Sequence, residues 1–267
     1  MELTLKREAH FAGSFYPEEP ALLEGLIKKF LAQATVKKIK KTPKALIAPH
    51  AGYLYSGPVA GYAYKLIKEL DFKKIILLGP SHHFPFKGLI SGGFKIWQTP
   101  LGPVESFTLN DFPALKDKAL ISEASKIHEP EHCLEVQIPF LQMTLHDFKI
   151  FPLLSGQNEI KEIKDMAILL NKIMDEKTLL IVSSDLSHYY PYDEAQRLDK
   201  VTLDAILAND LLRFDKFGEA CGKTAIEILM ALAQINHWQS TLLSYLNSGD
   251  TSGEKSQVVG YASLVFS

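Results

Sequence analysis

Three short apolar segments of the chain are each followed by histidine or aspartate. The segments and the polar residues after them are Ala45–Ala48 with His50, Ile75–Leu78 with His82 and His83, and Leu179–Val182 with Asp185 and His188. Such runs predict buried strands, parallel where helices separate them. Ligands bind outside the carboxyl ends of strands in open α/β sheets, so we expect these side chains to converge in one cleft.

These residue types suit a metal site. Neutral imidazole is the commonest metal ligand in proteins, and two histidines with one anionic ligand can hold a divalent ion with open positions. The sequence offers Asp185 and Cys221 as the anion. Cys221 stands just before Ala225–Leu232, an apolar run that predicts a helix. The positive end of this helix and Lys223 are expected to lower the thiol pKa, whereas the alternative is a small buried packing residue.

A second group of polar residues occupies positions 128–135. His128 and His132 stand four residues apart, but Pro130 between them opposes the helix that a zinc motif with this spacing requires. His132 and Glu135 can share one helical turn and face the cleft as acid–base or supporting groups. Cys133 is interpreted as a packing residue.

Alternating elements predict an α/β fold that forms one domain over residues 1–267, with a mixed central sheet. The predicted helices are Pro20–Ala34, Val59–Leu70 with Pro58 near its first position, Glu159–Glu176 and Asp193–Asn209. Pro139 argues against one uninterrupted helix over 134–146. Ser240–Leu246 and Val258–Phe266 predict two strands joined by a mobile loop rich in glycine and serine.

Composition narrows the function classes. Hydrophobic residues make up 46% of the chain and the formal net charge is -2, so global charge gives no reason to expect a nucleic acid or an anionic membrane as partner. No apolar run approaches the ~20 residues of a membrane span. No secretory signal is recognised and there are 2 cysteines, which favours a cytoplasmic location without a disulfide framework. The sequence has no P-loop, dinucleotide-binding fingerprint or nucleophile elbow, and nothing pairs a particular serine with a base.

Six motifs, spread in order over almost the whole chain, together resemble the Memo family. They are Arg7–Pro17, Ala48–Tyr53, Gly79–His83, Glu131–Glu135, Ser183–His188 and Cys221-Gly222. Prokaryotic members of this family are called AmmeMemoRadiSam system protein B, and the human member is the mediator of ErbB2-driven cell motility. The resemblance implies a three-layer fold similar to LigB-type class III extradiol dioxygenases, with a central mixed sheet between helical layers.

The resemblance also implies a metal site. His50, His82 and Cys221 match the positions of its direct ligands, and Asp185 and His188 match residues that line the same pocket. The implied metal is iron, with copper or zinc as alternatives. The family name implies association with a radical-SAM protein and an AMMECR1-like protein. One departure from the dioxygenases is that a thiolate stands where they use a glutamate, which weakens the transfer of ring-cleaving activity.

Three functions remain open at this point. The first is metal-dependent redox chemistry, in which Asp185 or His188 moves protons and His132 and Glu135 support the site. The second is a module that binds a small molecule, a peptide or a partner protein in the cleft, with a structural or stored metal. The third is zinc-dependent hydrolysis, in which the ion lowers the pKa of a bound water.

Overall fold

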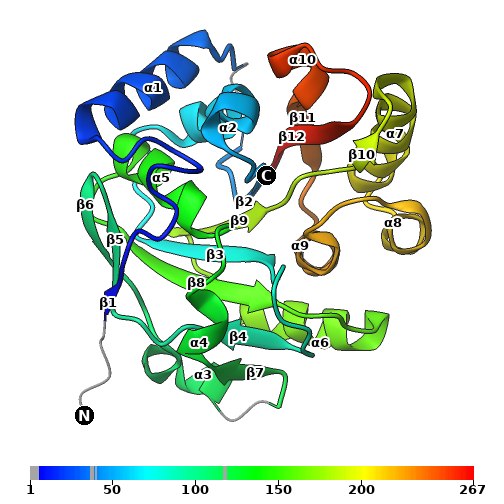
Figure 1. The fold of residues 1–267 in the computed structure, drawn as a ribbon. Helices are drawn as coiled ribbons and strands as arrows, with labels where there is room; N and C mark the ends of the chain where they lie inside the picture. Colours follow the sequence, from blue (N-terminus) through cyan, green and yellow to red (C-terminus); the bar gives the residue numbers. More distant parts are fainter. Residues whose placement is uncertain (1–5, 37–38, 40, 117–118) are drawn as a thin grey trace.

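The computed structural model describes residues 6–36, 39, 41–116 and 119–267 (Figure 1). Its helices are α1 (Pro20–Gln33), α2 (Tyr53–Ile67), α3 (Pro113–Lys116), α4 (Ser125–His128), α5 (Ile138–Thr144), α6 (Ile160–Asn171), α7 (Tyr192–Leu207), α8 (Leu211–Phe217), α9 (Lys223–Asn236) and α10 (Ser248–Ser252). Its strands are β1 (Lys6–Arg7), β2 (Ala45–Ala48), β3 (Lys74–Pro80), β4 (Leu89–Ser91), β5 (Ile96–Thr99), β6 (Gly102–Glu105), β7 (Ile121–Glu123), β8 (Lys149–Ser155), β9 (Thr178–Ser183), β10 (His188–Tyr190), β11 (Ser240–Asn247) and β12 (Val258–Phe266). Short 3₁₀ helices cover Leu109–Asp111 and Glu135–Gln137.

The central sheet brings the three histidine-bearing strands side by side. Its order is β10-β12-β2-β9-β3-β8-β4-β7, with β11 paired to β12. Strand β9 lies between β2 and β3 and runs parallel to both. Ala48 is opposite Ser183 at the end of this parallel pair, so the segments that follow β2 and β9 leave the sheet at the same edge. The expected alignment of these carboxyl ends is therefore confirmed.

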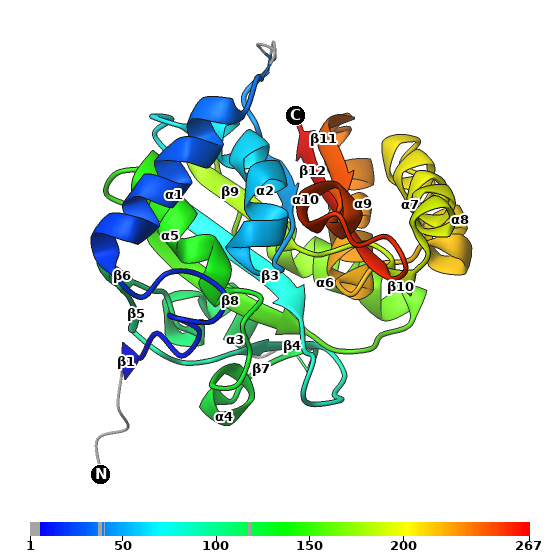
Figure 2. The ribbon, with the colours of Figure 1, turned by 45° about the horizontal axis from the view of Figure 1, so that its top comes forward.

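Alternate residues of these strands pack into two hydrophobic cores, one on each face of the sheet. Ile76 and Leu78 of β3 belong to the core that contains residues of α6 and α9, whereas Ile75 and Leu77 belong to the core that contains residues of α1, α2 and α5. Figures 1 and 2 show the sheet between these two groups of helices. A strand that is buried on both faces needs apolar side chains at consecutive positions, which explains its unbroken hydrophobic sequence. The predicted α/β fold, a mixed sheet flanked by helices in a single domain, is confirmed.

Most predicted helices agree with the structure to within a few residues, but α2 begins earlier than predicted. It starts at Tyr53, and Pro58 lies inside the helix and not at its first position. The error came from treating proline as a start signal, whereas the apolar residues of α2 bury enough surface to tolerate one missing backbone donor. Pro139 does stand at the start of α5, after a separate 3₁₀ turn.

The end of the chain forms the expected antiparallel pair, β11 and β12. The connection between them is not simply a loop, because it contains α10. Asn247 and Asp250 form a capping box at the start of this short helix, and Gly253 ends it with a left-handed φ of 83°. Asn247, Asp250 and Gly253 of the segment that suggested a mobile loop are thus helix-capping residues.

A smaller sheet, with strand order β1-β5-β6, lies beside the large one and carries Arg7 (Figure 1). Arg7 on β1 pairs in register with Trp97 on β5, and its guanidinium group lies 4.4 Å from the centre of that indole ring. Within the described ranges, no helix combines the length and hydrophobicity that crossing a bilayer requires.

Candidate metal centre

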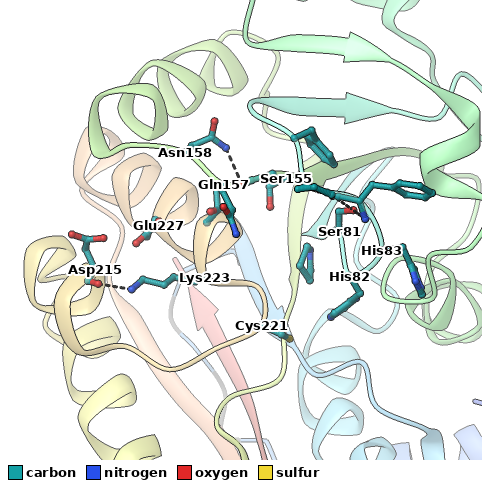
Figure 3. A pocket seen from close by; sticks show the side chains of 16 residues that line it. Ser81, His82, His83, Ser155, Gln157, Asn158, Asp215, Cys221, Lys223 and Glu227 are labelled. Carbon is teal, nitrogen blue, oxygen red and sulfur yellow. Dashed lines mark hydrogen bonds between the residues drawn. The ribbon is translucent and has the colours of Figure 1, made fainter.

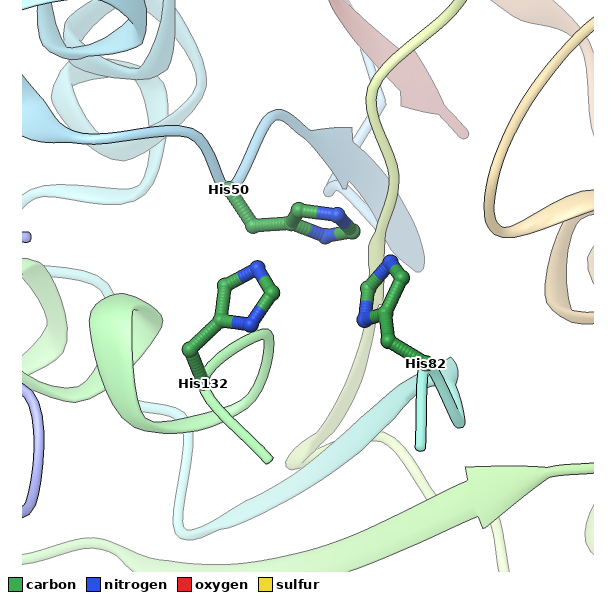
Figure 4. Close-up of side chains that lie close together, drawn as sticks. All are labelled: His50, His82 and His132. Carbon is green, nitrogen blue, oxygen red and sulfur yellow. The ribbon is translucent and has the colours of Figure 1, made fainter. Parts of the chain in front are cut away.

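Three histidine rings gather at the carboxyl edge of the sheet (Figure 4). His50 follows β2, His82 follows β3, and His132 lies just before the 3₁₀ turn Glu135–Gln137. Among the described residues, their donor atoms form a group whose members all lie within 4.8 Å of one another. Two ligands of one zinc-sized ion are at most roughly 4.6 Å apart, so this spacing fits a single metal ion.

The ring of His50 is held in one orientation by a chain of hydrogen bonds. Tyr64 donates its hydroxyl to Gln137 Oε1 (2.6 Å), and Gln137 Nε2 donates to Ser183 Oγ (2.7 Å). Ser183 in turn donates to the carbonyl of Cys133 (2.6 Å), so its oxygen accepts from Nδ1 of His50 at 3.0 Å. This pattern places the ring proton on Nδ1 and leaves Nε2 of His50 free as a metal ligand.

His82 is oriented in the same way by a carboxylate. Its Nδ1 lies 2.9 Å from Glu131 Oε1, and its backbone N–H donates to Glu131 Oε2 at 2.7 Å. Burial opposes ionisation of Glu131. The pKa of Glu131 is nevertheless lowered below its ordinary value, by the hydrogen bond and charge of His82 and by the backbone N–H groups of His82 and Cys133. A carboxylate behind a ligand histidine fixes the tautomer and makes the ring a stronger donor.

Ring directions separate His50 from the other two. The His50 ring is nearly perpendicular to those of His82 and His132, at 87° and 89°, whereas His82 and His132 stack at 22° (Figure 4). Lone pairs of imidazole nitrogens lie in the ring plane, so two stacked rings direct them side by side. The angles therefore set His50 apart from a stacked pair, and all three rings belong to the group that could hold one ion.

Burial keeps the rings of His50 and His132 neutral. It is the largest influence on His50 and His132, and with the neighbouring imidazoles it lowers the pKa of each to about 3. Neutral imidazole is the form that binds a metal ion. The site is thus ready to accept a cation near neutral pH without first losing protons from these two rings.

Cys221 completes this edge of the site. Its Sγ lies 3.1 Å from His50 Nε2 and accepts the backbone N–H of Asp185 at 3.2 Å. Cys221 is not a member of the group of three rings. The next residue is Gly222, where a Cβ would stand 2.7 Å from Cβ of Ser184, so glycine is required for the thiol to approach β9 this closely.

The expectation of a low thiol pKa at Cys221 is wrong for the metal-free protein. Burial raises the pKa of this thiol above its ordinary value, and the Asp185 carboxylate adds to the shift. Lys223 does not offset this effect, because its ammonium group donates to the backbone carbonyl of Asp215 (Figure 3). Desolvation of the thiolate therefore outweighs the helix end.

Asp185 and His188 lie on the segment that follows β9. Asp185 is buried and its carboxylate accepts the backbone N–H of His50 at 2.8 Å. Burial raises the pKa of Asp185 to about 6, against the backbone N–H groups of His50 and Ala51 and the charge of His188. His188 is half-buried at the start of β10, and Tyr189 after it has a left-handed φ of 64°. The strained backbone at Tyr189 accompanies a shift in register against β12.

Glu135 does not face the cleft, contrary to the sequence-based expectation. Its side chain and that of Arg7 are completely buried and form an ion pair. The carboxylate also accepts the Tyr16 hydroxyl at 2.6 Å and the Phe11 backbone N–H at 2.8 Å. These contacts leave Glu135 no capacity for acid–base work, and they attach the N-terminal segment to the loop that carries His132.

The comparisons with known proteins identify the family of this chain. Residues 7–265 match the family model described as Memo-like protein. The chain belongs to the Memo family. A MEMO1 family protein of Archaeoglobus fulgidus is 34% identical over 97% of this chain and 99% of its own length. A second, from Thermoplasma acidophilum, is 36% identical over 98% of both chains.

Fold comparison extends this similarity to a distant structure. The crystal structure of an uncharacterized protein from Escherichia coli K12 superimposes with a TM-score of 0.54 at 12% identity, and covers 85% of this chain and all of the other. At this identity the likeness shows a shared fold alone.

Sequence reasoning missed the residues that orient the ligands, namely Glu131, Ser183 and Gln137. Glu131 stands next to His132 in the sequence, and a carboxylate beside a candidate ligand is a usual partner for the second imidazole nitrogen. That signal was available. No comparable signal marks Ser183 or Gln137, because their role depends on segments that meet only in the fold.

Glu131→Gln is expected to weaken metal binding by about 10- to 100-fold, the usual effect of removing a partner behind a ligand. The amide lacks the charge that holds Nδ1–H of His82, so the ring loses its fixed orientation. Isothermal titration calorimetry with Zn²⁺ measures the change. Glu129→Gln, at an exposed position two residues away, is the control and should bind as the wild type does. Equal affinities of the two variants would contradict this role of Glu131.

A cavity of about 520 Å³ adjoins the cluster and is lined by His82 and Cys221 (Figure 3). Glu227, from α9, also lines it and is only 3% exposed. Burial raises the pKa of Glu227 from 4.5 to about 7, the Lys223 ammonium opposes this shift, and the Asp215 carboxylate adds to it.

This raised pKa predicts how stability depends on pH. The Glu227 carboxyl favours the folded state most below pH 4.5, and its contribution is lost as the pH rises through about 7. The difference in free energy of unfolding between Glu227→Gln and the wild type should therefore shift in favour of the variant by about 1–2 kcal/mol as the pH rises from 5 to 8. This figure is reduced for partial solvent screening of the carboxylate. Denaturant unfolding of the metal-free proteins across this range measures the gain, and a pH-independent difference would contradict it.

Proposed function

We propose that this Memo family protein binds an iron ion through His50, His82 and Cys221 and performs redox chemistry on a small molecule in the adjoining cleft. The observations that carry the proposal are the grouping of the His50 and His82 rings and the contact of the Cys221 thiol with His50 Nε2 at 3.1 Å, while each imidazole is held from behind at Nδ1. Two imidazoles and one thiolate suit iron, copper or zinc. When bound, an iron ion supplies electron transfer and coordination positions that the protein does not fill.

The remaining polar residues support this centre. Asp185 holds the backbone at His50 and presents a buried carboxylate beside Cys221, which makes it a candidate for proton transfer. His132 flanks His82, and the aromatic rings of Phe11 and Phe15 cover it at centroid distances of 5.7 Å and 4.4 Å. This cover excludes water from one side of the site.

Anaerobic loading with Fe²⁺, followed by elemental analysis and O₂-uptake assays on metabolite mixtures, tests the proposal. We expect about one iron ion per chain, bound through the proposed three ligands, and O₂ uptake that depends on iron and on a component of the mixture. Stoichiometric metal binding without turnover for any first-row metal would refute the redox function. Higher affinity and hydrolytic turnover with Zn²⁺ alone would instead favour the hydrolase.

A second candidate is a binding module. It is supported by exposed apolar side chains next to site segments, at Leu54 (75%), Tyr55 (46%) and Tyr189 (70%). Co-purification from native cells separates the candidates. A stable complex that needs Tyr55 and Tyr189 but survives His50→Ala would favour binding.

A further inference from the structure

The cavity beside the candidate metal centre has two chemically different ends (Figure 3). His82 and Cys221 stand where it meets the cluster, and Asp215, Lys223 and Glu227 form the opposite side. The wall between them includes Ser81, Ser155, Gln157 and Asn158. Its volume of about 520 Å³ suits a small polar molecule.

Glu227 is the unusual group in this cavity. Its side chain is 97% buried by the packing of α9, yet Oε1 has no hydrogen-bond partner among the described residues. A buried carboxylate oxygen without a partner is costly to stability, and native proteins seldom keep one without a function. Glu227 is one of the residues that line the cavity, so a small rotation of its side chain would bring Oε1 to a donor on a bound molecule.

The charges around Glu227 indicate what kind of hydrogen-bond donor a ligand should bring to its carboxylate. Apart from its histidines, the charged residues of the cavity are two carboxylates, Asp215 and Glu227, and one ammonium, Lys223. Lys223 donates to the main-chain carbonyl of Asp215, so it does not satisfy Glu227 Oε1. The formal charge at this end is negative when Glu227 is ionised, which repels an anionic ligand and attracts a cation.

We propose that this cavity binds a small organic ammonium ion, whose amine contacts Glu227 while its other end reaches the metal ion at His82 and Cys221. The contact with the metal ion rests on the proposed function. The contact between the amine and Glu227 needs only the protein chain, so the two contacts can be tested separately.

The first experiment uses metal-free protein. The carboxyl group of Glu227 is followed by ¹³C NMR during pH titration, with n-butylamine or n-butanol added. We expect the amine, but not the alcohol, to lower the apparent pKa of Glu227 measurably. No shift with butylamine, or an equal shift with butanol, would overturn the inference whether or not the protein binds metal.

The second experiment uses iron-loaded protein and a series of ω-aminoalkyl hydroxamates of increasing chain length, each compared with the alkyl hydroxamate that lacks the amine. At the best length we expect at least about tenfold tighter binding with the amine, by calorimetry, since a desolvated charge pair contributes at this scale. Equal binding of the probes with and without the amine would refute the inference about Glu227, but it would not contradict the proposed metal centre. A carboxylate-terminated probe that binds more tightly than either would also refute it.

Single substitutions test whether Glu227 is the residue that contacts the amine. Glu227→Gln should reduce the advantage of the amine probes to less than about twofold, whereas Glu176→Gln, at an exposed site, should preserve it. Lys223→Met should increase the affinity for the amine, because it removes a like charge beside Glu227. If Glu227→Gln does not fold, a failure of Lys223→Met to strengthen amine binding would still refute the inference.

Discussion

Alanine at His50, His82 or Cys221 is expected to lower metal affinity by more than about 100-fold, a larger loss than removal of a partner behind a ligand causes. Each substitution deletes one of three donors, and the two that remain cannot complete the coordination shell. The affinity for Zn²⁺ and Fe²⁺ is measured by competition with a chelator of known strength. Because the His50 ring is neutral in the folded protein, the loss with His50→Ala should vary little between pH 6 and 8. Burial raises the pKa of the Cys221 thiol, which must lose its proton to bind a metal ion, so the loss with Cys221→Ala should grow as the pH rises.

His83→Ala and Cys133→Ala are the matched controls. His83 is exposed beside His82, and Cys133 is buried with its thiol donating to the carbonyl of Pro80 at 3.2 Å. Both should change metal affinity by less than about tenfold, the lower bound for a partner behind a ligand. His132→Ala should behave like these controls, because the third ligand in our proposal is the Cys221 thiol and not His132. A loss with His132→Ala that matches His50→Ala would show that the third ligand is an imidazole and not the thiol.

Arg7→Met is expected to lower the free energy of unfolding by about 3–5 kcal/mol, because it leaves the carboxylate of Glu135 buried without its partner. Arg7 also donates to the backbone carbonyls of His128 (3.1 Å) and Glu131 (2.8 Å), so it fixes the loop that orients His82. Metal affinity should therefore fall together with stability. Urea unfolding of the metal-free protein, followed by metal titration of the folded variant, measures both effects.

Arg197→Met removes an exposed ion pair to Glu194 and serves as the control, with an expected loss of at most about 1 kcal/mol. The double variant Arg7→Met with Glu135→Gln should recover part of the stability lost by Arg7→Met, since the uncompensated charge is gone. Our account of the buried pair would be wrong if Arg7→Met were no more destabilising than Arg197→Met.

Local sequence patterns were sufficient to predict the buried strands and the edge of the sheet at which the candidate site lies. Ile75–Leu78 is apolar at every position because the sheet is covered on both faces, and that pattern is visible in the sequence. The polar residues that follow β2, β3 and β9 had to meet, because parallel neighbours end at one edge. Pro58 and the segment before β12 were misread because tertiary burial and helix capping outweighed the usual meaning of proline, glycine and serine.

The sequence by itself indicated the fold class and the family, and it predicted that His50, His82 and Asp185 follow strands of one sheet, because periodicity and motif order are properties of the chain. Only the tertiary structure decided the directions of the rings, the burial that raises the pKa of Cys221, and the withdrawal of Glu135 into an ion pair with Arg7. Those features depend on desolvation and on contacts between segments that are distant in the sequence, such as Arg7 and Glu135, whose positions differ by 128. No local pattern specifies such contacts.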